Sequence, residues 1–159
     1  EDARRLIEAA RAARERAWAP MSGFHVGAAL LDEFGHLWSG CNIEDAQPAL
    51  TTCAERVALH SALAAGVRRF GALAVVTSAD PLPASPCGLC RQQLLSWAVD
   101  PIWLAGESNT VAYRVRLRDL LPAPFARNPT DVTQPATADD RTPGPRSSTS
   151  PALPDRKRS

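Results

Sequence analysis

The chain carries the sequence CAER at residues 53–56 and PCGLCRQ at residues 86–92, which together hold three cysteines and a glutamate. Cys87 and Cys90 are three positions apart, so both sulfurs lie on one face of a first helical turn. Cys53 also falls at a predicted helix start, where the partial positive charge of the helix favours a thiolate. Three protein ligands and one open position are typical of a catalytic zinc site. The two segments therefore predict two helix N-termini that face each other across Zn2+.

The glutamate of the first segment suits a proton carrier rather than a ligand. Glu55 follows Cys53 by two residues, roughly 200° around a helix at about 100° per residue, so its carboxylate diverges from the sulfur. It would then lie beside the open position and move protons to and from the water that the metal activates. Three thiolates on a divalent cation leave a net negative charge, which weakens the Lewis acid. Arg56 is predicted to hydrogen-bond a ligating sulfur and withdraw charge, with Arg91 and Gln92 as further candidates for that role.

A structural zinc site, saturated by protein atoms, is the main alternative. Its fourth ligand would come from Cys41, His25, His36 or His60. Cys41 lies in an apolar run, where a cysteine commonly packs as a small hydrophobe. A Cys-x-x-Cys pair can also be a redox pair, but the distant Cys-x-Glu favours a metal. The order of the segments favours catalytic zinc over both alternatives.

Hydrophobic periodicity predicts helices that alternate with strands along most of the chain. Ala19-Pro20 ends the first helix, and Thr51 or Thr52 can cap the second. Helices are predicted at 2–18, from the Thr51-Thr52 cap to Gly66, at 87–99 and at 117–121; strands are predicted at 25–32, 36–43, 70–78, 102–105 and 111–117. Such alternation indicates an α/β domain with three α/β/α layers, and the opening hairpin makes its five-stranded sheet mixed.

Composition separates a folded domain from a tail and excludes some partners. Residues 127–159 are rich in proline, serine and threonine and lack aromatics, so we expect a domain at 1–126 and a disordered tail at 127–159. The net charge of +1 gives no general attraction to nucleic acid or acidic lipid. No apolar run approaches the roughly 18 residues of a membrane span, and no signal peptide is visible. These features indicate a cytoplasmic protein whose cysteines bind metal rather than form disulfides.

The chain resembles the small homotetrameric zinc-dependent cytidine deaminases over about residues 1–126. Beyond the two cysteine segments, the resemblance rests on AWAPMSGFHVGAALL at 17–31, GCNIEDA at 40–46 and LLPAPF at 120–125. It implies a cytidine-deaminase-like fold, with Zn2+ bound by Cys53, Cys87 and Cys90 and with Glu55 as the acid and base. It also implies hydrolysis of cytidine and 2′-deoxycytidine to uridine and 2′-deoxyuridine in pyrimidine salvage.

The same resemblance implies a set of nucleoside contacts. Asn42 and Glu44 would hydrogen-bond the ribose hydroxyls, a role that an amide beside a carboxylate suits chemically. Phe24 and Ala54 would line the nucleoside pocket, and Phe125 would reach the base from a neighbouring subunit. The partners implied are a small nucleoside and further copies of the chain in a homotetramer, without nucleic acid or membrane.

Three positions depart from the family pattern. The family usually has asparagine at the position of Asp45, an aromatic residue at that of Pro48 and tyrosine at that of Met21. Because these positions lie at the pocket rim, the chain could instead deaminate a modified cytosine nucleoside or a nucleoside antibiotic. A deaminase of polynucleotides would normally need a basic groove, which the near-neutral domain does not provide. A non-catalytic interaction module with structural zinc is the alternative outside enzymes.

Overall fold

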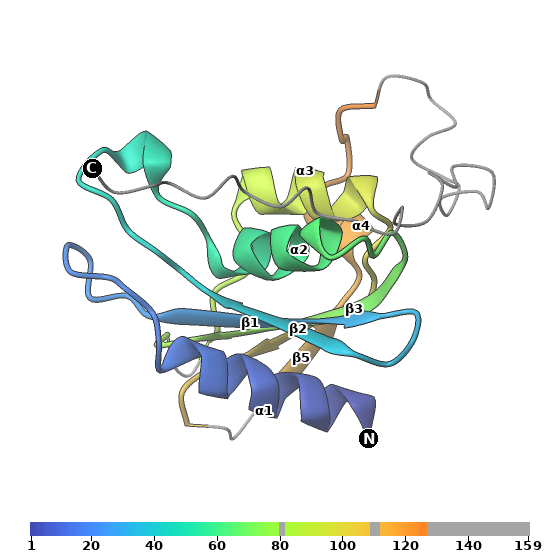
Figure 1. The fold of residues 1–159 in the computed structure, drawn as a ribbon, viewed down its shortest axis with the longest axis horizontal. Coiled ribbons are helices and arrows are strands. Elements are labelled where there is room, and N and C mark those ends of the chain that lie inside the picture. The colour runs from blue at the N-terminus through green and yellow to red at the C-terminus, as the bar shows by residue number, and fades with distance from the viewer. Residues whose placement is uncertain (80–81, 109–111, 127–159) are drawn as a thin grey trace, which may run out of the picture.

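The structure, a computed structural model, describes residues 1–79, 82–108 and 112–126, and the predicted tail at 127–159 lies outside that range (Figure 1). Within the described residues, one five-stranded sheet has the order β2-β1-β3-β4-β5. The β3–β4 pair is parallel and the other neighbouring pairs are antiparallel, which confirms the mixed sheet. The strands are β1 (Val26–Asp32), β2 (Leu37–Cys41), β3 (Phe70–Thr77), β4 (Ile102–Ala105) and β5 (Ala112–Val115).

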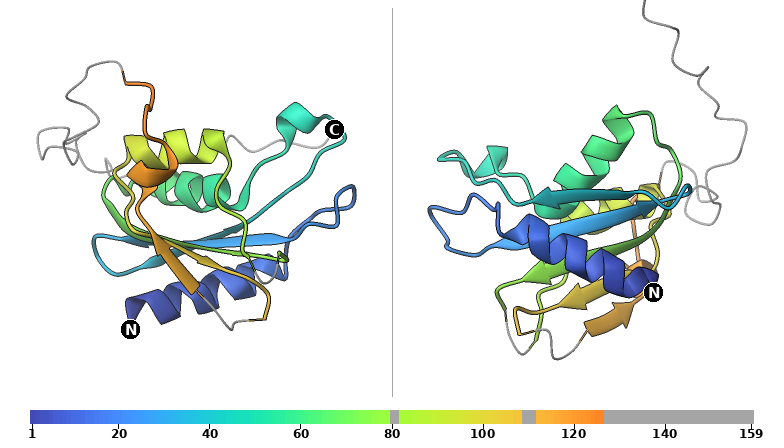
Figure 2. Two further views of the ribbon diagram at one scale, coloured as in Figure 1. Left: turned by 180° about the vertical axis from the view of Figure 1, so that it is seen from behind. Right: turned by 60° about the horizontal axis from the view of Figure 1, so that its bottom comes forward.

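Helices cover both faces of this sheet and complete three layers (Figures 1 and 2). Helix α1 (Asp2–Arg14) lies alone on one face, and α2 (Ala54–Ala64) and α3 (Gly88–Ser96) lie on the other. The short α4 (Leu117–Leu120) packs beside α3, and a single 3-10 turn, η1, spans Pro48–Leu50. None of the helices in the described part of the chain is long and apolar enough to cross a bilayer.

The central strands are apolar on both faces because both faces are covered. Along β1, side chains alternate between the two layers: Leu30 packs in the core beneath α2 and α3, whereas Ala29 packs beneath α1. In β3, Val75 and Ala74 repeat that division. The continuous apolar runs in the sequence therefore mark strands at the centre of the sheet.

Glycine allows one helix to approach the sheet closely and so places the cysteines. A Cβ atom on Gly40 in β2 would overlap main-chain atoms of Ala54 and Ala58 in α2. The backbones of β2 and α2 therefore pack directly against each other. This contact fixes the N-terminal end of α2, where Cys53 lies, over the end of β2.

Two expected helix boundaries are wrong. The first helix ends at Arg14 rather than at 18, and the Trp18 main chain instead pairs with the segment after β2: its N–H donates to the Asn42 carbonyl at 3.0 Å and its carbonyl accepts from Glu44 N–H at 2.8 Å. These hydrogen bonds hold Trp18 outside the helix, with 61% of its surface exposed. The cap of α2 is Cys53, not Thr51 or Thr52. Sequence periodicity could not reveal these main-chain pairings, because they join segments far apart.

The remaining elements occur where they were expected, most of them with shorter bounds. The helix expected at 87–99 spans Gly88–Ser96, and the strand expected at 102–105 spans the same residues. The edge strand expected at 111–117 covers Ala112–Val115, and the chain then turns into α4. The strand hairpin expected at 25–43 is present as β1 and β2.

Candidate metal centre and nucleoside pocket

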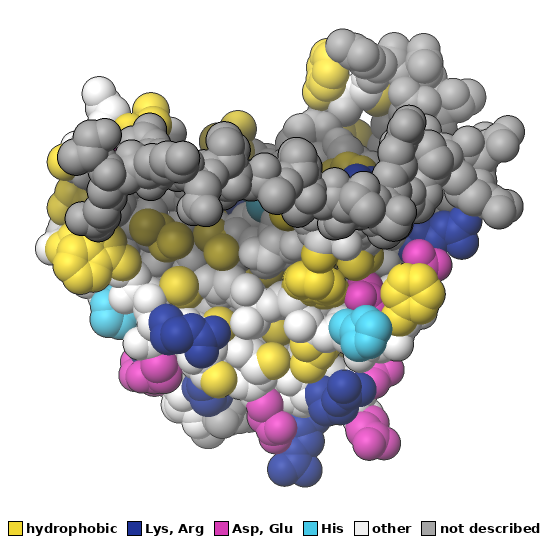
Figure 3. Space-filling model, in the orientation of Figure 1, with side chains coloured by type: hydrophobic (Ala, Val, Ile, Leu, Met, Phe, Trp, Pro, Cys, Tyr) yellow, Lys and Arg dark blue, Asp and Glu magenta, His cyan; other side chains and the backbone are white. Residues whose placement is uncertain are grey.

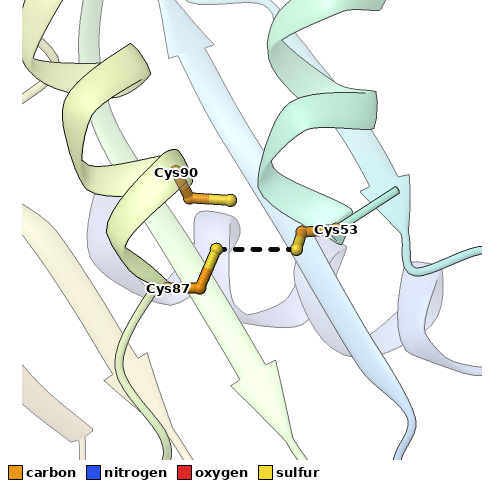
Figure 4. Close-up of side chains that lie close together, drawn as sticks. All are labelled: Cys53, Cys87 and Cys90. Carbon is orange, nitrogen blue, oxygen red and sulfur yellow. Dashed lines mark hydrogen bonds between the residues drawn. The ribbon is translucent and has the colours of Figure 1, made fainter. Parts of the chain in front are cut away.

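Three cysteine side chains converge where the N-termini of α2 and α3 meet (Figure 4). Cys53 is the N-cap of α2, Cys87 is the N-cap of α3, and Cys90 lies in the first turn of α3. The Sγ atoms of Cys53 and Cys87 are 3.8 Å apart, and all three sulfurs lie within 4.8 Å of one another. A tetrahedral zinc ion with Zn–S bonds of about 2.3 Å separates its sulfur ligands by about 3.8 Å. The donor atoms and their spacing therefore fit zinc.

The suggested fourth ligands do not join this cluster. In the described residues, Cys53, Cys87 and Cys90 form the only group of three or more side chains of metal-binding type close enough to share an ion. The Cys41 thiol donates to the Arg16 carbonyl at 3.3 Å. The His36 ring lies 3.3 Å from Asp32, and His60 accepts from the Gln93 amide at 2.7 Å. These partners favour a site that keeps one position open.

The pKa values of Cys53 and Cys90 shift in opposite directions. A hydrogen bond from Cys90 is the largest cause that lowers the pKa of Cys53 to about 5, and Cys87 and Arg56 lower it further against the effect of burial. The pKa of Cys90 is raised by the same hydrogen bond with Cys53 and by burial. Of these two thiols, Cys53 is therefore the one that favours the thiolate. A divalent ion would compensate this charge on all three sulfurs.

Glu55 lies in the first turn of α2, directly behind the cluster. Its side chain is buried, with 4% of the residue surface exposed. Burial is the main cause that raises the pKa of the Glu55 carboxyl to about 7; the charge at Cys53 acts in the same direction, and a hydrogen bond with Cys90 acts against it. These interactions place the carboxyl group against the sulfurs. A carboxyl group with such a pKa can accept and return a proton near neutral pH.

Arg56, Arg91 and Gln92 make different sets of contacts around the cluster. Arg56 Nη2 donates to the Thr51 carbonyl at 2.9 Å, and its guanidinium is close enough to lower the pKa of Cys53. The Arg91 and Gln92 hydrogen bonds go to other groups than sulfur. Arg91 donates to the Pro86 and Leu120 carbonyls and the Ser85 hydroxyl, and Gln92 pairs with the Phe125 main chain.

Asn42 and Phe24 lie together at the end of β2. The Asn42 side-chain oxygen accepts from Val26 N–H and its Nδ2 donates to the Phe24 carbonyl, both at 2.8 Å. Phe24 is 38% exposed, whereas Asn42 is buried. Ala54, at the start of α2, is fully buried, and neither its side chain nor its main chain is exposed in this copy. The structure therefore gives Asn42 a main-chain anchoring role that the sequence did not indicate.

Glu44 closes the loop that precedes Phe24. Its carboxylate accepts hydrogen bonds from the Ser22 hydroxyl, from Met21 N–H at 2.8 Å and from Ser22 N–H at 3.2 Å. The Ser22 hydroxyl is the main cause that lowers the pKa of Glu44, followed by the Met21 N–H. Sequence reasoning missed Ser22, because its importance depends on a carboxylate 22 residues away.

The unusual residues of the rim form a local turn. The Asp45 carboxylate accepts from Gln47 N–H at 2.8 Å, and Asp45 N–H donates to the Thr51 hydroxyl at 3.1 Å. Pro48 then opens η1. The segment around Asp45 and Pro48 is exposed. Phe125, expected to act in a neighbouring copy, is 76% exposed in this one.

Comparison with known proteins agrees with this geometry. Residues 1–105 match the family model described as "Cytidine and deoxycytidylate deaminase zinc-binding region". A cytidine deaminase from Sporosarcina psychrophila is 43% identical over 133 residues, which cover 79% of this chain and 93% of that protein. The crystal structure of cytidine deaminase from Burkholderia pseudomallei superposes with a TM-score of 0.72 at 45% identity, covering 77% of this chain and 98% of that one.

A relative with a different name is also similar. A protein named blasticidin-S deaminase from Bacillus cereus is 32% identical over 111 residues, covering 65% of this chain and 76% of that protein.

Proposed function

The chain belongs to the cytidine and deoxycytidylate deaminase family with a zinc-binding region, and from this premise we propose that it hydrolyses cytidine and 2′-deoxycytidine to uridine and 2′-deoxyuridine. The observation that carries the proposal is the three-sulfur cluster of Cys53, Cys87 and Cys90 with the buried Glu55 carboxyl against it. In this assignment the three cysteines hold the zinc ion. Zinc, when bound, supplies a Lewis acid that makes water a nucleophile near neutral pH.

Glu55 moves the protons of the reaction. It accepts a proton from the attacking water and delivers one to the ring nitrogen beside the reacting carbon. The carbon–oxygen bond forms in this addition. Glu55 then takes the second proton from the added hydroxyl and passes it to the amino group, so that the carbon–nitrogen bond breaks, ammonia departs and the carbon–oxygen bond becomes a carbonyl. The reaction is a hydrolysis and consumes neither oxidant nor reductant. Burial of Glu55 supports this role, because it keeps the carboxyl group away from bulk water.

The nucleoside would be held by groups at the ends of β2 and α2. Asn42 still has one amide hydrogen beyond its bond to Phe24, and Glu44 can accept from a hydroxyl in addition to its bonds within the loop. These groups suit the ribose. The Phe24 ring and a Phe125 ring from another copy would contact the base.

The proposal extends to the assembly and the setting of the enzyme. Phe125 is highly exposed in one copy, which supports a homotetramer whose subunits complete each other's pockets. The domain would cover residues 1–126 and the tail 127–159. Free thiols at a metal site suit a reducing compartment, so we place the enzyme in the cytoplasm and in pyrimidine salvage.

A polynucleotide substrate is not favoured. On the face shown in Figure 3, basic and acidic side chains are interspersed around α1. Pairs such as Arg4–Glu8 and Arg5–Asp2 place opposite charges side by side on that helix. Binding to single strands relies on a basic groove, and these pairs offset the arginine charges.

A second candidate substrate is a modified cytosine nucleoside. It is favoured by the rim residues Asp45 and Pro48 and by the likeness to a protein named blasticidin-S deaminase. Turnover of cytidine, 2′-deoxycytidine and blasticidin-S by the same preparation separates the two candidates. A strong preference for cytidine removes the second.

Substitution of the proton carrier tests the assigned chemistry. Glu55→Gln should lower kcat by about 10²- to 10⁴-fold, because it loses the acid and base but keeps a similar shape. Zinc content should stay at that of the wild type. Glu33→Gln, in the β1–β2 turn, is the matched control and should keep full activity. Full activity of zinc-loaded Glu55→Gln would refute the role of Glu55.

A further inference from the structure

The side chain of Gln92 recognises both main-chain groups of a single residue, Phe125. Its Oε1 accepts from Phe125 N–H at 2.8 Å, and its Nε2 donates to the Phe125 carbonyl at 2.9 Å. A primary amide is the side chain that matches this pair, because it has an acceptor and a donor side by side. Gln92 therefore binds Phe125 much as a neighbouring strand would.

The pairing of the Phe125 main chain with Gln92 leaves the Phe125 ring facing away from α3. An extended residue directs its N–H and carbonyl to one edge, and its side chain stands away from that edge. With both groups turned toward α3, the ring is left 76% exposed. Exposure of a phenyl ring is unfavourable in a single copy, because burial of apolar surface is favourable. The segment is thus held by its main chain in a form that presents the ring outward.

A second contact fixes the same segment upstream. Arg91 Nη1 donates to the Leu120 carbonyl at 2.8 Å. Adjacent side chains of α3 therefore hold the segment 120–125 near both of its ends, as it runs beside α3 in Figure 1. The helix is the one whose first turn carries Cys90. The hydrogen bonds from Arg91 and Gln92 therefore fix the position of the Phe125 ring relative to α3, the helix that carries Cys90.

We propose that Gln92 is a positioning residue for the reaction: it sets the main chain of Phe125 so that the ring reaches the nucleoside base in a neighbouring copy. This inference rests on the proposed function, which gives Phe125 its contact with the base. Gln92 itself touches neither the substrate nor the reacting atoms. Its effect is on substrate binding through Phe125, and chemistry at the metal is left unchanged.

Two neighbouring glutamines allow a matched test. Gln92→Leu removes both hydrogen bonds to Phe125 at similar size, whereas Gln93→Leu removes only a contact with His60 from the next position of the same helix. Hydrogen exchange at the Phe125 amide reports the anchor directly and needs no activity. It should become at least about tenfold faster in Gln92→Leu, because its acceptor is gone, and stay unchanged in Gln93→Leu.

Steady-state kinetics with cytidine then test the role in binding. Gln92→Leu should raise KM about three- to tenfold with kcat within about twofold of the wild type, at unchanged zinc content. Gln92→Glu keeps the acceptor for Phe125 N–H, so its KM should lie between those of the wild type and Gln92→Leu. In a Phe125→Ala background, Gln92→Leu should have no further effect on KM, since the ring it positions is absent.

The outcomes separate this inference from the proposed function. Wild-type turnover of cytidine together with a KM effect of Phe125→Ala supports the proposed contact. If Gln92→Leu then leaves KM unchanged, or raises it equally with and without the Phe125 ring, the inference is overturned and the function stands. A wild-type protein that does not deaminate cytidine overturns the proposed function. In that case, unchanged amide exchange in Gln92→Leu would overturn the anchor as well.

Discussion

Asn42 holds the main chain of Phe24 through a hydrogen bond of 2.8 Å from its Nδ2 to the Phe24 carbonyl. Its Oδ1 accepts at the same distance from Val26 N–H, so one buried amide fixes the chain where it enters β1. Gln92 likewise holds the main chain of Phe125, near the C-terminal end of the domain, through two side-chain hydrogen bonds. Both aromatic rings assigned to the nucleoside are therefore carried on main-chain segments that a side-chain amide holds in place.

Asn42→Asp should separate this anchoring from any contact with ribose. The new carboxylate oxygen faces the Phe24 carbonyl, so a donor is lost and two acceptors meet. The free energy of unfolding should fall by about 1–3 kcal/mol. Chemical denaturation of the zinc-loaded protein measures this free energy. Asp45→Asn, in the exposed rim, is the control and should leave it unchanged. Unchanged stability, with only KM affected, would mean that Asn42 acts on the substrate alone.

Arg91 braces the loop that carries Cys87. It donates to the Pro86 carbonyl at 2.6 Å, to the Ser85 hydroxyl at 2.7 Å and to the Leu120 carbonyl at 2.8 Å. Lysine cannot reproduce these three directions from one nitrogen. Arg91→Lys should therefore weaken zinc binding by about 10- to 100-fold, the usual cost of losing a group that orients a ligand.

Competition with a chelator measures that affinity. Arg68→Lys is the matched control, because Arg68 also donates to main-chain carbonyls, those of Leu63 and Val67, but follows the C-terminal end of α2, whereas Cys53 is at its N-terminal end. Equal zinc affinity of the Arg91→Lys variant and the wild type would show that the loop keeps its shape without the guanidinium.

Asp32 gives stability that depends on pH. Burial by itself would raise the pKa of its carboxyl, but hydrogen bonds from the Trp38 indole, from the N–H groups of His36 and Phe34 and from the His36 ring lower it below the usual 3.8. A lowered pKa in the folded state adds stability above the unfolded pKa of about 3.9, and that stability is lost as pH falls through the folded value.

Trp38→Phe should shift this dependence. It removes the indole donor, 3.0 Å from Asp32 Oδ2, so the pKa of Asp32 should rise. The variant should be about 1 kcal/mol less stable at pH 7, and the difference should shrink as the pH falls below about 4. Titration of the Asp32 carboxyl carbon by NMR gives the pKa itself. A titration midpoint that is the same in both proteins would contradict the role of the indole.

The sequence predicted the cluster of three cysteines because its signals are local. Cys87 and Cys90 need only a helical turn to share a face, and the helix starts at Cys53 and Cys87 follow from the same short segments. The apolar run of β1 likewise reflects burial on both faces of a central strand, which composition alone reveals.

Contacts to the main chain were not predictable in the same way. Trp18 continues the helical periodicity, yet pairs with the chain around Asn42 because the fold brings an unpaired edge beside it. Arg91 and Gln92 each donate to one carbonyl group about thirty residues away, and every residue has a carbonyl group. No residue type marks such a partner, so the anchoring of Phe125 became visible only in the structure.

X-ray absorption at the zinc edge of the metal-loaded protein tests the central claim most directly. The claim is that three sulfurs of this chain hold zinc and leave one position to solvent. The spectrum should fit three sulfur atoms at about 2.3 Å and one oxygen at about 2.0 Å. A fit with a fourth sulfur, or with a histidine nitrogen in place of the oxygen, would contradict the claim, because a saturated ion could not activate water.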